Sequence, residues 1–224
     1  MKNTTLFLLC AFILLFNDAD AQWQSMNGPQ GRYVRSILCT DSLYYAATGG
    51  GVLVSSDQGL NWEFRNNGLT SCDTKCLVTY NDTVFLATDE NIFRTTDGGQ
   101  HWTPDPYLHN HYIKHILVHH GSLLASTYVQ GVYQSTQGTQ GEYTSDAFPG
   151  DVRYPYFMAD NEDAMFIATY RRGVYRSFDD GASWETCNNG LNSDVLGIYC
   201  HNGKVFATVL GQGVMMSNDD GNNW

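Results

Sequence analysis

The sequence predicts an all-β protein folded as a β-propeller of four-stranded blades. One eight-residue string recurs along the chain at a nearly constant interval. Short apolar segments separated by turn residues fill each interval, and 22 Gly, 14 Tyr and 11 Phe among 224 residues suit strands joined by tight turns. A repeat of about 40 residues that contains four short strands is typical of one propeller blade.

The recurring string, which we call the box, is "SSDQGLNW" at 55–62. It returns as "TTDGGQHW" (95–102), "SFDDGASW" (177–184) and "SNDDGNNW" (217–224). The aromatic residues that close the units, Trp62, Trp102, Tyr143, Trp184 and Trp224, are 40 or 41 residues apart. The third unit, "STQGTQGEY" (135–143), has Gln137 in place of Asp and one additional residue. We therefore expect five units, of which the third has a looser turn.

Each unit is predicted to contain the same elements in the same order. The first strand is a short apolar segment such as "HILV" (115–118), and a tight turn such as "HNG" (201–203) follows this strand. The second strand ends in Ala-Thr, as at Ala47-Thr48, and the third begins with Gly-Val, as at Gly173-Val174. The box then forms the hairpin that leads into the fourth strand at its Trp.

Each residue type of the box has a structural role in that hairpin. The Asp at the third position accepts backbone N–H groups, and the Ser or Thr at the first position caps the same loop. The Gly at the fifth position takes a positive φ, and the Trp at the eighth buries its ring between sheets. Catalytic carboxylates or calcium ligands are the less favoured interpretation, since every blade has a box whereas an enzyme needs one site. The residues assigned to the structural box are Ser55, Asp57, Gly59, Trp62, Thr95, Asp97, Gly99, Trp102, Ser177, Asp179, Gly181, Trp184, Ser217, Asp219, Gly221 and Trp224.

The beginning of the chain has the pattern of an export signal over residues 1–21. Lys2 supplies the positive charge, "LFLLCAFILLF" (6–16) is too short to span a bilayer, and "ADA" (19–21) offers a cleavage site. Lipidation at Cys10 is the less favoured alternative. We expect a propeller domain over 22–224 that is secreted, either extracellular, periplasmic or at the cell surface, with no membrane span.

The last box ends at Trp224, where an outer strand is expected to begin. One interpretation is a closed ring of five blades, in which "QWQSMN" (22–27) supplies the missing strand of the last blade. The interpretation that we favour is that these units belong to a longer propeller of six to eight blades.

The box resembles the Asp-box, or BNR, repeat, Ser/Thr-x-Asp-x-Gly-x-x-Trp. The resemblance covers residues 22–224. Families with this repeat include sialidases, xyloglucan-cleaving glycosidases, sortilin-type receptors, the photosystem II assembly factor and many exported bacterial proteins. The resemblance implies a β-propeller fold. Because these families have different activities, the function has to be inferred from the residues of the site and not from the repeat.

Length variation indicates which face binds a ligand. The interval from the Thr that ends the second strand to the box ranges from 7 to 9 residues, whereas the box itself is nearly constant. Variable loops gathered on one face favour a binding surface there, and Tyr and Arg recur in these loops. The predicted ligand-binding residues are Arg32, Tyr33, His109, His111, Tyr128, Arg153, Tyr154, Tyr170, Arg171 and Arg172.

The functional prediction is a non-catalytic module that binds a glycan or another exported protein. A formal net charge of −11 argues against nucleic acid and anionic membranes as partners. The rival is a glycosidase with part of its site beyond residue 224. A sialidase would need an Arg-Ile-Pro element, but Tyr33-Val34 follow Arg32, and nothing marks a Tyr nucleophile. A xyloglucanase would need two acids across a cleft, for which the loop candidates are Asp89, Glu90 and Asp151.

No cofactor and no metal site are predicted. The histidines of "HNHYIKHILVHH" (109–120) flank one strand, so His109 and His111 lie at one end and His119 and His120 at the other. A strand of six residues is about 20 Å long, whereas metal–ligand distances are about 2 Å, so the two pairs cannot share an ion. His109 and His111 alone are a weaker metal candidate.

The cysteines give two further expectations. Cys72 and Cys76 are predicted to close a local disulfide, since export permits one. Cys39 and Cys200 occupy equivalent strand positions in different blades, which favours buried thiols over a bridge between them.

Overall fold

The computed structural model confirms the predicted all-β propeller. It describes residues 28, 33–128, 130–137, 140–144 and 155–224. In this part of the chain every regular element is a strand, and the strands form four sheets of four strands and one sheet of three. No helix of the described residues has the length and apolar character needed to cross a membrane.

Each sheet is one blade, and its strands follow chain order. The strands are β1 (Val34–Cys39), β2 (Tyr44–Thr48), β3 (Gly51–Ser55) and β4 (Glu63–Phe64) in blade 1; β5 (Thr74–Tyr80), β6 (Thr83–Thr88), β7 (Asn91–Thr95) and β8 (Thr103–His109) in blade 2; β9 (Ile113–His119), β10 (Ser122–Thr127), β11 (Val132–Gln137) and β12 (Gln140–Thr144) in blade 3; β13 (Pro155–Asp160), β14 (Met165–Thr169), β15 (Gly173–Ser177) and β16 (Glu185–Thr186) in blade 4; and β17 (Val195–His201), β18 (Lys204–Val209) and β19 (Gly213–Ser217) in blade 5.

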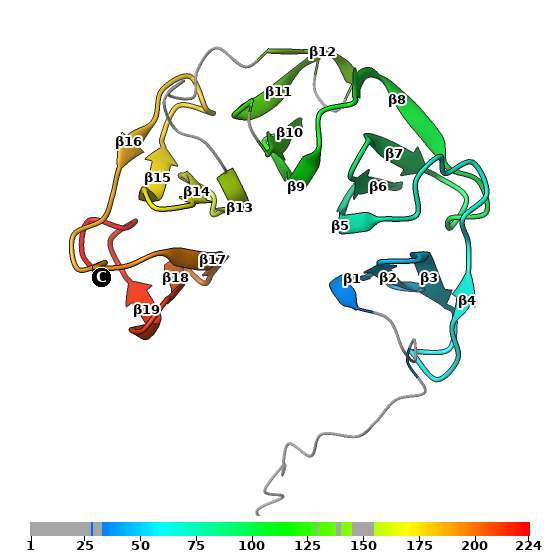
Figure 1. The fold of residues 1–224 in the computed structure, drawn as a ribbon, viewed down its shortest axis with the longest axis horizontal. Helices are drawn as coiled ribbons and strands as arrows, with labels where there is room; N and C mark the ends of the chain where they lie inside the picture. The colour runs from blue at the N-terminus through cyan, green and yellow to red at the C-terminus, as the bar shows by residue number, and fades with distance from the viewer. Residues whose placement is uncertain (1–27, 29–32, 129, 138–139, 145–154) are drawn as a thin grey trace, which may run out of the picture.

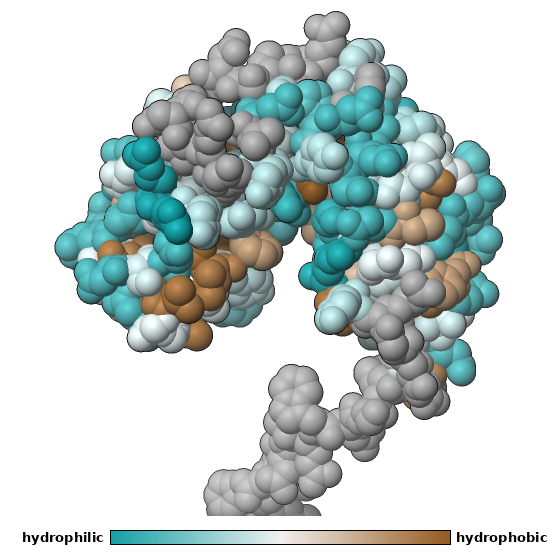
Figure 2. All heavy atoms as spheres, viewed as in Figure 1, coloured by the Kyte–Doolittle hydropathy of each residue, from teal (hydrophilic) through white to brown (hydrophobic). Residues whose placement is uncertain are grey.

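The blades lie side by side in an arc, with the first strand of each on the inside (Figure 1). The arc is open between β17 and β1, so these five blades do not close into a ring. Hydrophobic side chains gather over the blade of β17, β18 and β19 beside the opening (Figure 2). Leu196, Tyr199 and Val214 of this blade and Ile37 of β1 are more than half exposed. The total number of blades in the protein stays a prediction.

Every inner strand contains the same irregularity directly after its first residue. Val34 pairs with Thr48, but the next paired residue is Ser36, so Arg35 is an extra residue in the ladder. The same shift follows the first residue of β5, β9, β13 and β17. A β-bulge of this kind redirects a side chain locally. The extra residues, which we call the bulge residues, are Arg35, Lys75, Lys114, Tyr156 and Leu196.

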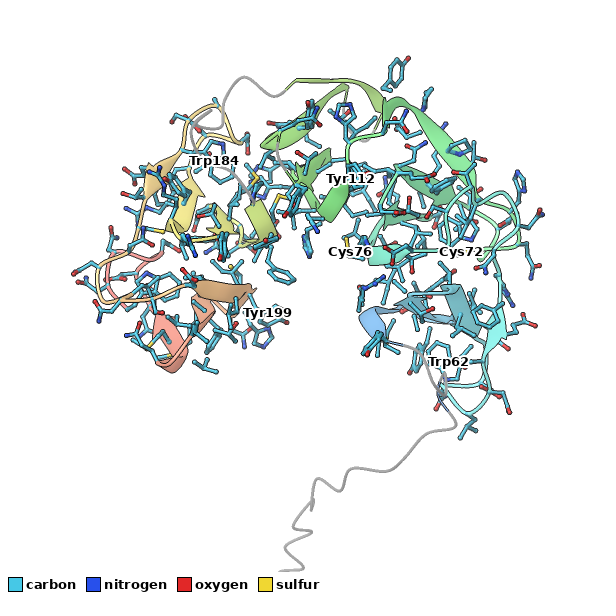
Figure 3. All side chains as sticks on the ribbon, in the orientation of Figure 1. Trp62, Cys72, Cys76, Tyr112, Trp184 and Tyr199 are labelled. Atoms are coloured by element: carbon cyan, nitrogen blue, oxygen red, sulfur yellow. The ribbon has the colours of Figure 1, made fainter. Side chains whose placement is uncertain are left out.

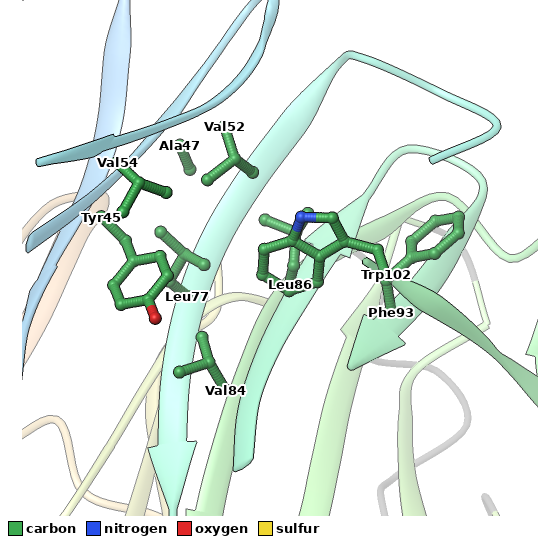
Figure 4. Close-up of a cluster of buried hydrophobic side chains, with 9 residues drawn as sticks. All are labelled: Tyr45, Ala47, Val52, Val54, Leu77, Val84, Leu86, Phe93 and Trp102. Carbon is green, nitrogen blue, oxygen red and sulfur yellow. The ribbon is translucent and has the colours of Figure 1, made fainter. Parts of the chain in front are cut away.

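The hydrophobic core lies between adjacent blades. Between blades 1 and 2, Val52 and Val54 of β3 face Leu77, Leu86 and neighbouring side chains of blade 2 (Figure 4). Equivalent clusters of buried side chains join blades 2 and 3 and blades 4 and 5. Each sheet therefore depends on its neighbours for the burial of its apolar faces, as in other repeat architectures.

The box segments form tight, hydrogen-bonded turns after β3, β7, β15 and β19. In the second box, Thr95 Oγ1 donates to Asp97 Oδ1 (2.7 Å) and accepts from Gly99 N (3.1 Å). Asp97 Oδ1 also accepts from His101 N (3.1 Å). Gly99 has a φ of 83°, which a residue with a side chain adopts at a cost. The other three described boxes have the same bonds.

The Trp rings of the boxes differ in burial, which corrects the expectation that all are buried between sheets. Trp102 is 0% exposed and its Nε1 donates to Arg65 O of the preceding blade (2.8 Å). Trp62 and Trp184 are half-buried, and each donates to the Gly carbonyl of its own box. Trp224 is also half-buried, although it reaches Cys187 O of blade 4 (2.7 Å). The predicted looser box at 135–143 falls partly outside the described residues.

The structure overturns one cysteine prediction and part of another. Cys72 and Cys76 are free thiols: Cys72 is exposed on the loop before β5, whereas Cys76 is buried in β5 and its Sγ accepts from Ile116 N of blade 3 (3.2 Å) (Figure 3). The predicted disulfide is therefore wrong, since the two side chains occupy different environments. Cys39 and Cys200 have equivalent registers and are both free thiols, as expected, but neither is fully buried: Cys200 is half-buried and Cys39 is exposed.

Candidate ligand-binding face

The antiparallel order places the starts of the first and third strands at the same edge of every blade. We call this edge of the propeller the bulge face, and the opposite edge, which carries the boxes, the box face. On the bulge face of blades 1, 2, 3 and 5 the loop after the second strand is tied to the residue before the first strand. These bonds are Gly49 N to Tyr33 O, Asp89 N to Asp73 O, Tyr128 N to Tyr112 O and Leu210 N to Asp194 O, at 2.9–3.3 Å. The loops predicted to bind a ligand thus surround the inner strands at one face.

Three consecutive blades present a cation at the bulge position. Arg35, Lys75 and Lys114 are the bulge residues of β1, β5 and β9, whose blades are neighbours. Arg35 and Lys75 both form ion pairs with the carboxylate of Asp73. Arg35 Nη1 also donates to Thr74 O (2.8 Å), which fixes the guanidinium next to the second blade. The repeat therefore aligns three positive groups along the inner rim.

Asp73 and Lys114 respond differently to this environment. Partial burial raises the pKa of Asp73, but hydrogen bonds from Lys75 and Arg35 outweigh that effect, so its pKa is lowered and it stays ionised. Burial lowers the pKa of Lys114, and the charge of Lys75 lowers it further. No carboxylate among the described residues lies within ion-pair distance of Lys114. A bound anion beside Lys114 would favour its charged form and so oppose the effects of burial and of the Lys75 charge.

Aromatic rings continue this surface into blade 4. Lys114 Nζ lies 4.7 Å from the ring centroid of Tyr128 and 5.9 Å from that of Tyr156. Tyr156 contacts Tyr170 edge-on at 6.2 Å, and the Arg171 guanidinium lies 4.9 Å from the centroid of the Tyr170 ring. The three cations of blades 1 to 3 are thus followed by three tyrosine rings, with a cation in contact with the rings at either end. We call this set the cation–tyrosine cluster: Arg35, Lys75, Lys114, Tyr128, Tyr156, Tyr170 and Arg171.

Of the ten ligand-binding residues predicted from the sequence, the structure brings Tyr128, Tyr170 and Arg171 into this cluster. Arg172 is exposed and lines, with Arg171, a groove of about 480 Å³ beside blade 5. His111 hydrogen-bonds Gln130 (2.6 Å) and packs on Tyr133, and His109 ends β8. Tyr33 is 85% exposed before β1. Arg32, Arg153 and Tyr154 lie outside the described residues.

Sequence reasoning missed Arg35, Lys75, Lys114 and Tyr156. The predicted site residues came from the variable loops, whereas these residues belong to the strands. All four are the second residue of the first strand of their blade. If the repeats are aligned on their first strands, these residues fall at one aligned position, which could have identified them.

Of the three acids considered for a glycosidase, the structure describes Asp89 and Glu90, which are consecutive residues of one loop. Asp89 accepts a hydrogen bond from Ser71 (2.5 Å), and Glu90 is exposed on the loop before β7. Asp151 lies outside the described residues. Among the described residues of the bulge face, the carboxylate closest to the cation–tyrosine cluster is Asp73, which is ion-paired with Arg35 and Lys75.

No protein-family profile and no curated protein matches this chain. Among solved structures, it is similar to the extracellular domain of BT4673 from B. thetaiotaomicron, with a TM-score of 0.67 at 14% identity, covering 83% of this chain and 26% of that one. It is similar to YCF48 bound to D1 peptide, with a TM-score of 0.66 at 15% identity over 86% of this chain and 66% of that one. An ancestral GH74 enzyme matches with a TM-score of 0.65 at 16% identity over 90% and 33%. The chain thus spans about a quarter of the length of the first relative, and these likenesses show the β-propeller fold.

Proposed function

We propose that this chain is an exported, non-catalytic binding propeller whose bulge face captures an acidic segment of another protein. The observation that supports the proposal is the column of Arg35, Lys75 and Lys114 at one register position of three adjacent blades. Core packing does not require cations there, since the same position holds Tyr156 and Leu196 in blades 4 and 5.

The chemistry of the cluster suits a carboxylate-bearing peptide. Arg35 and Lys75 share the carboxylate of Asp73, and their remaining N–H groups, together with those of Lys114, can donate to a carboxylate of the peptide. Tyr128 and Tyr156 supply ring faces for the apolar parts of side chains. The structure of YCF48 bound to D1 peptide supports the idea that a propeller of this shape can hold a peptide.

Export is part of the proposal. It is supported by the signal pattern of residues 1–21 and by the extracellular domains among the similar structures. An acidic glycan is the other ligand class that the sequence suggests, because tyrosine rings also stack on sugars. We favour a peptide because the three bulge cations belong to the inner strands of adjacent blades, one in each, where a chain with several carboxylates can contact them together.

The experiment measures binding of fluorescent peptides to the purified mature protein by fluorescence anisotropy. We expect Asp- and Glu-rich peptides to bind and their Asn and Gln counterparts not to bind. Lys114→Gln and Lys75→Gln are each expected to weaken binding roughly tenfold, since a hydrogen bond to a charged group contributes about 1.5–3 kcal/mol. Lys204→Gln, which changes an exposed lysine at the start of β18, is the control. Equal affinity for acidic and neutral peptides, or equal loss in the control, would contradict the proposal.

The rival proposal, a glycosidase, is distinguished by turnover. It is supported by the likeness to GH74 enzymes. Release of sugar from a xyloglucan fragment or a sialoside, abolished by Asp89→Asn or Glu90→Gln in a folded protein, would replace the binding proposal with the enzymatic one. Binding of uronic-acid oligosaccharides in preference to acidic peptides would replace the peptide by a glycan.

A further inference from the structure

We propose that His119, His120 and Asp180 form a binding site for a divalent transition metal of the zinc type, which joins blades 3 and 4 on the box face. His119 ends β9 and His120 follows in the turn to β10, whereas Asp180 lies in the box turn after β15. One potential ligand atom from each residue lies within 4.8 Å of the other two. The site is at the far end of β9 from Lys114, so it is separate from the cation–tyrosine cluster.

The central observation is a buried imidazole between two carboxylates. The side chain of His119 is 4% exposed, and its Nδ1 lies 2.9 Å from Asp160 Oδ2 while its Nε2 lies 3.3 Å from Asp180 Oδ1. An imidazole has one N–H when neutral, so if Nδ1 donates to Asp160, Nε2 turns a lone pair toward an oxygen that is also an acceptor. A positive centre between Nε2 and Asp180 resolves this contact, and it is either a second proton or a metal ion.

His120 supplies the third potential ligand. Its Nδ1 lies 2.7 Å from the same Asp180 Oδ1, and its ring centroid is 4.0 Å from that of His119. The Asp180 oxygen is therefore approached by nitrogens from both imidazoles. A separation of about 3.3 Å is what two ligands at about 2.0–2.1 Å from a tetrahedral ion show. Small rotations of the exposed His120 and Asp180 side chains complete that arrangement.

The repeat shows what the fold alone requires at this location. In the next blade pair, Asn161 takes the place of His119, and Asp220 takes the place of Asp180. There the contact is one hydrogen bond, from Asn161 Nδ2 to Asp220 Oδ1 (2.9 Å). The turn residue equivalent to His120 is Asn in two other blades, Asn81 and Asn202, both with positive φ like His120. Asn side chains are therefore sufficient for the hydrogen bond between blades and for the turn, so the fold does not require two imidazoles at this location.

The donor set selects the kind of metal. Two imidazole nitrogens and one carboxylate oxygen suit zinc and its neighbours in the first transition series, whereas calcium and magnesium prefer oxygen ligands. Asp160 accepts the hydrogen bond of the ligating His119, which is the arrangement that orients histidine ligands in zinc sites. Three protein ligands leave a fourth position for solvent.

The test uses the mature protein with zinc chloride in isothermal titration calorimetry, and with cobalt chloride in visible absorption. We expect one zinc ion per chain and the absorption of a tetrahedral cobalt complex. Asp180→Asn and His120→Ala are each expected to lower zinc affinity at least tenfold. His119→Asn copies Asn161 of the next blade and keeps a hydrogen bond to Asp180, so it should fold and fail to bind.

His201→Ala is the matched control, because His201 occupies the equivalent end of β17. It should retain zinc affinity, and circular dichroism should show that every variant keeps the sheet content of the original protein. Zinc should also raise the thermal midpoint of the original protein and of His201→Ala, and not that of His119→Asn. Absence of the cobalt signal, or equal zinc affinity in the original protein and in folded His119→Asn and Asp180→Asn, would overturn the proposal and leave a hydrogen-bonded triad.

Discussion

The ammonium group of Lys114 lies 5.9 Å from the centroid of the Tyr156 ring, although the two residues belong to different blades. They meet because each is the bulge residue of its inner strand, β9 or β13. A bulge in every blade thus converts the repeat into a row of side chains along one rim, and the residue type in each blade decides what that rim binds.

The first prediction concerns salt. If Lys114, Lys75 and Arg35 attract an acidic peptide, the affinity should fall as sodium chloride is raised, because salt screens exposed charges. In Lys114→Gln the dependence should be shallower, since one attractive charge is missing. Anisotropy titrations at several salt concentrations measure this, and an unchanged slope would assign the attraction to other residues.

The second prediction concerns the box turn. Thr95→Ala removes the acceptor of the Gly99 N–H and the donor to Asp97, at a position that is 3% exposed. An unsatisfied buried polar group costs about 1–3 kcal/mol, so the free energy of unfolding should fall by that amount. Urea denaturation followed by tryptophan fluorescence measures it. Thr96→Ala, at the exposed neighbouring residue, should have almost no effect, and Thr95→Ser should retain most of the stability.

The third prediction concerns pH. Burial lowers the pKa of His115 from 6.5 to about 4, and its Nδ1 has no hydrogen-bond partner among the described residues. The unfolded chain therefore binds this proton more readily, so the contribution of neutral His115 to stability is complete above about pH 6.5 and is lost as the pH falls toward 4. The loss between pH 7 and pH 4 is about 3 kcal/mol.

His115→Phe isolates this effect, because Phe157 occupies the same register position in the next blade. We expect the stability of the variant to depend less steeply on pH between 6.5 and 4 than that of the original protein. Parallel pH dependences in urea denaturation would show that other groups are responsible.

The fourth prediction concerns thiol reactivity. Cys39 and Cys72 are exposed, whereas burial raises the pKa of Cys76, Cys187 and Cys200 to about 12. Because the thiolate is the reactive form, two thiols of the folded mature protein should react quickly with a disulfide reagent and three slowly. Denaturation should equalise the rates. If only three thiols react after denaturation without reductant, two cysteines are joined in a disulfide, and the predicted Cys72–Cys76 bridge would again be supported.

The sequence was sufficient for features that depend on local spacing. Ser55, Asp57 and Gly59 lie within one turn, so their hydrogen bonds follow from the string itself. The site residues depend on register and on packing between blades. The contact of His119 with Asp180 joins different blades, and it was missed because the sequence argument compared the histidines only with one another. Cys72 and Cys76 show the reverse error, in which a short spacing suggested a bond that the placement of Cys76 inside β5 prevents.

The box turn occurs with the same hydrogen bonds after β3, β7, β15 and β19, but its Trp ranges from fully buried to half-buried. The same substitution can therefore be made in each of the four turns separately, while the rest of the chain stays unchanged, so that its effect is measured in four different surroundings. The spread of the four effects would separate what the turn contributes by itself from what its surroundings add. It would also show how much redundancy the repeat gives, and hence which copy is most free to change during evolution.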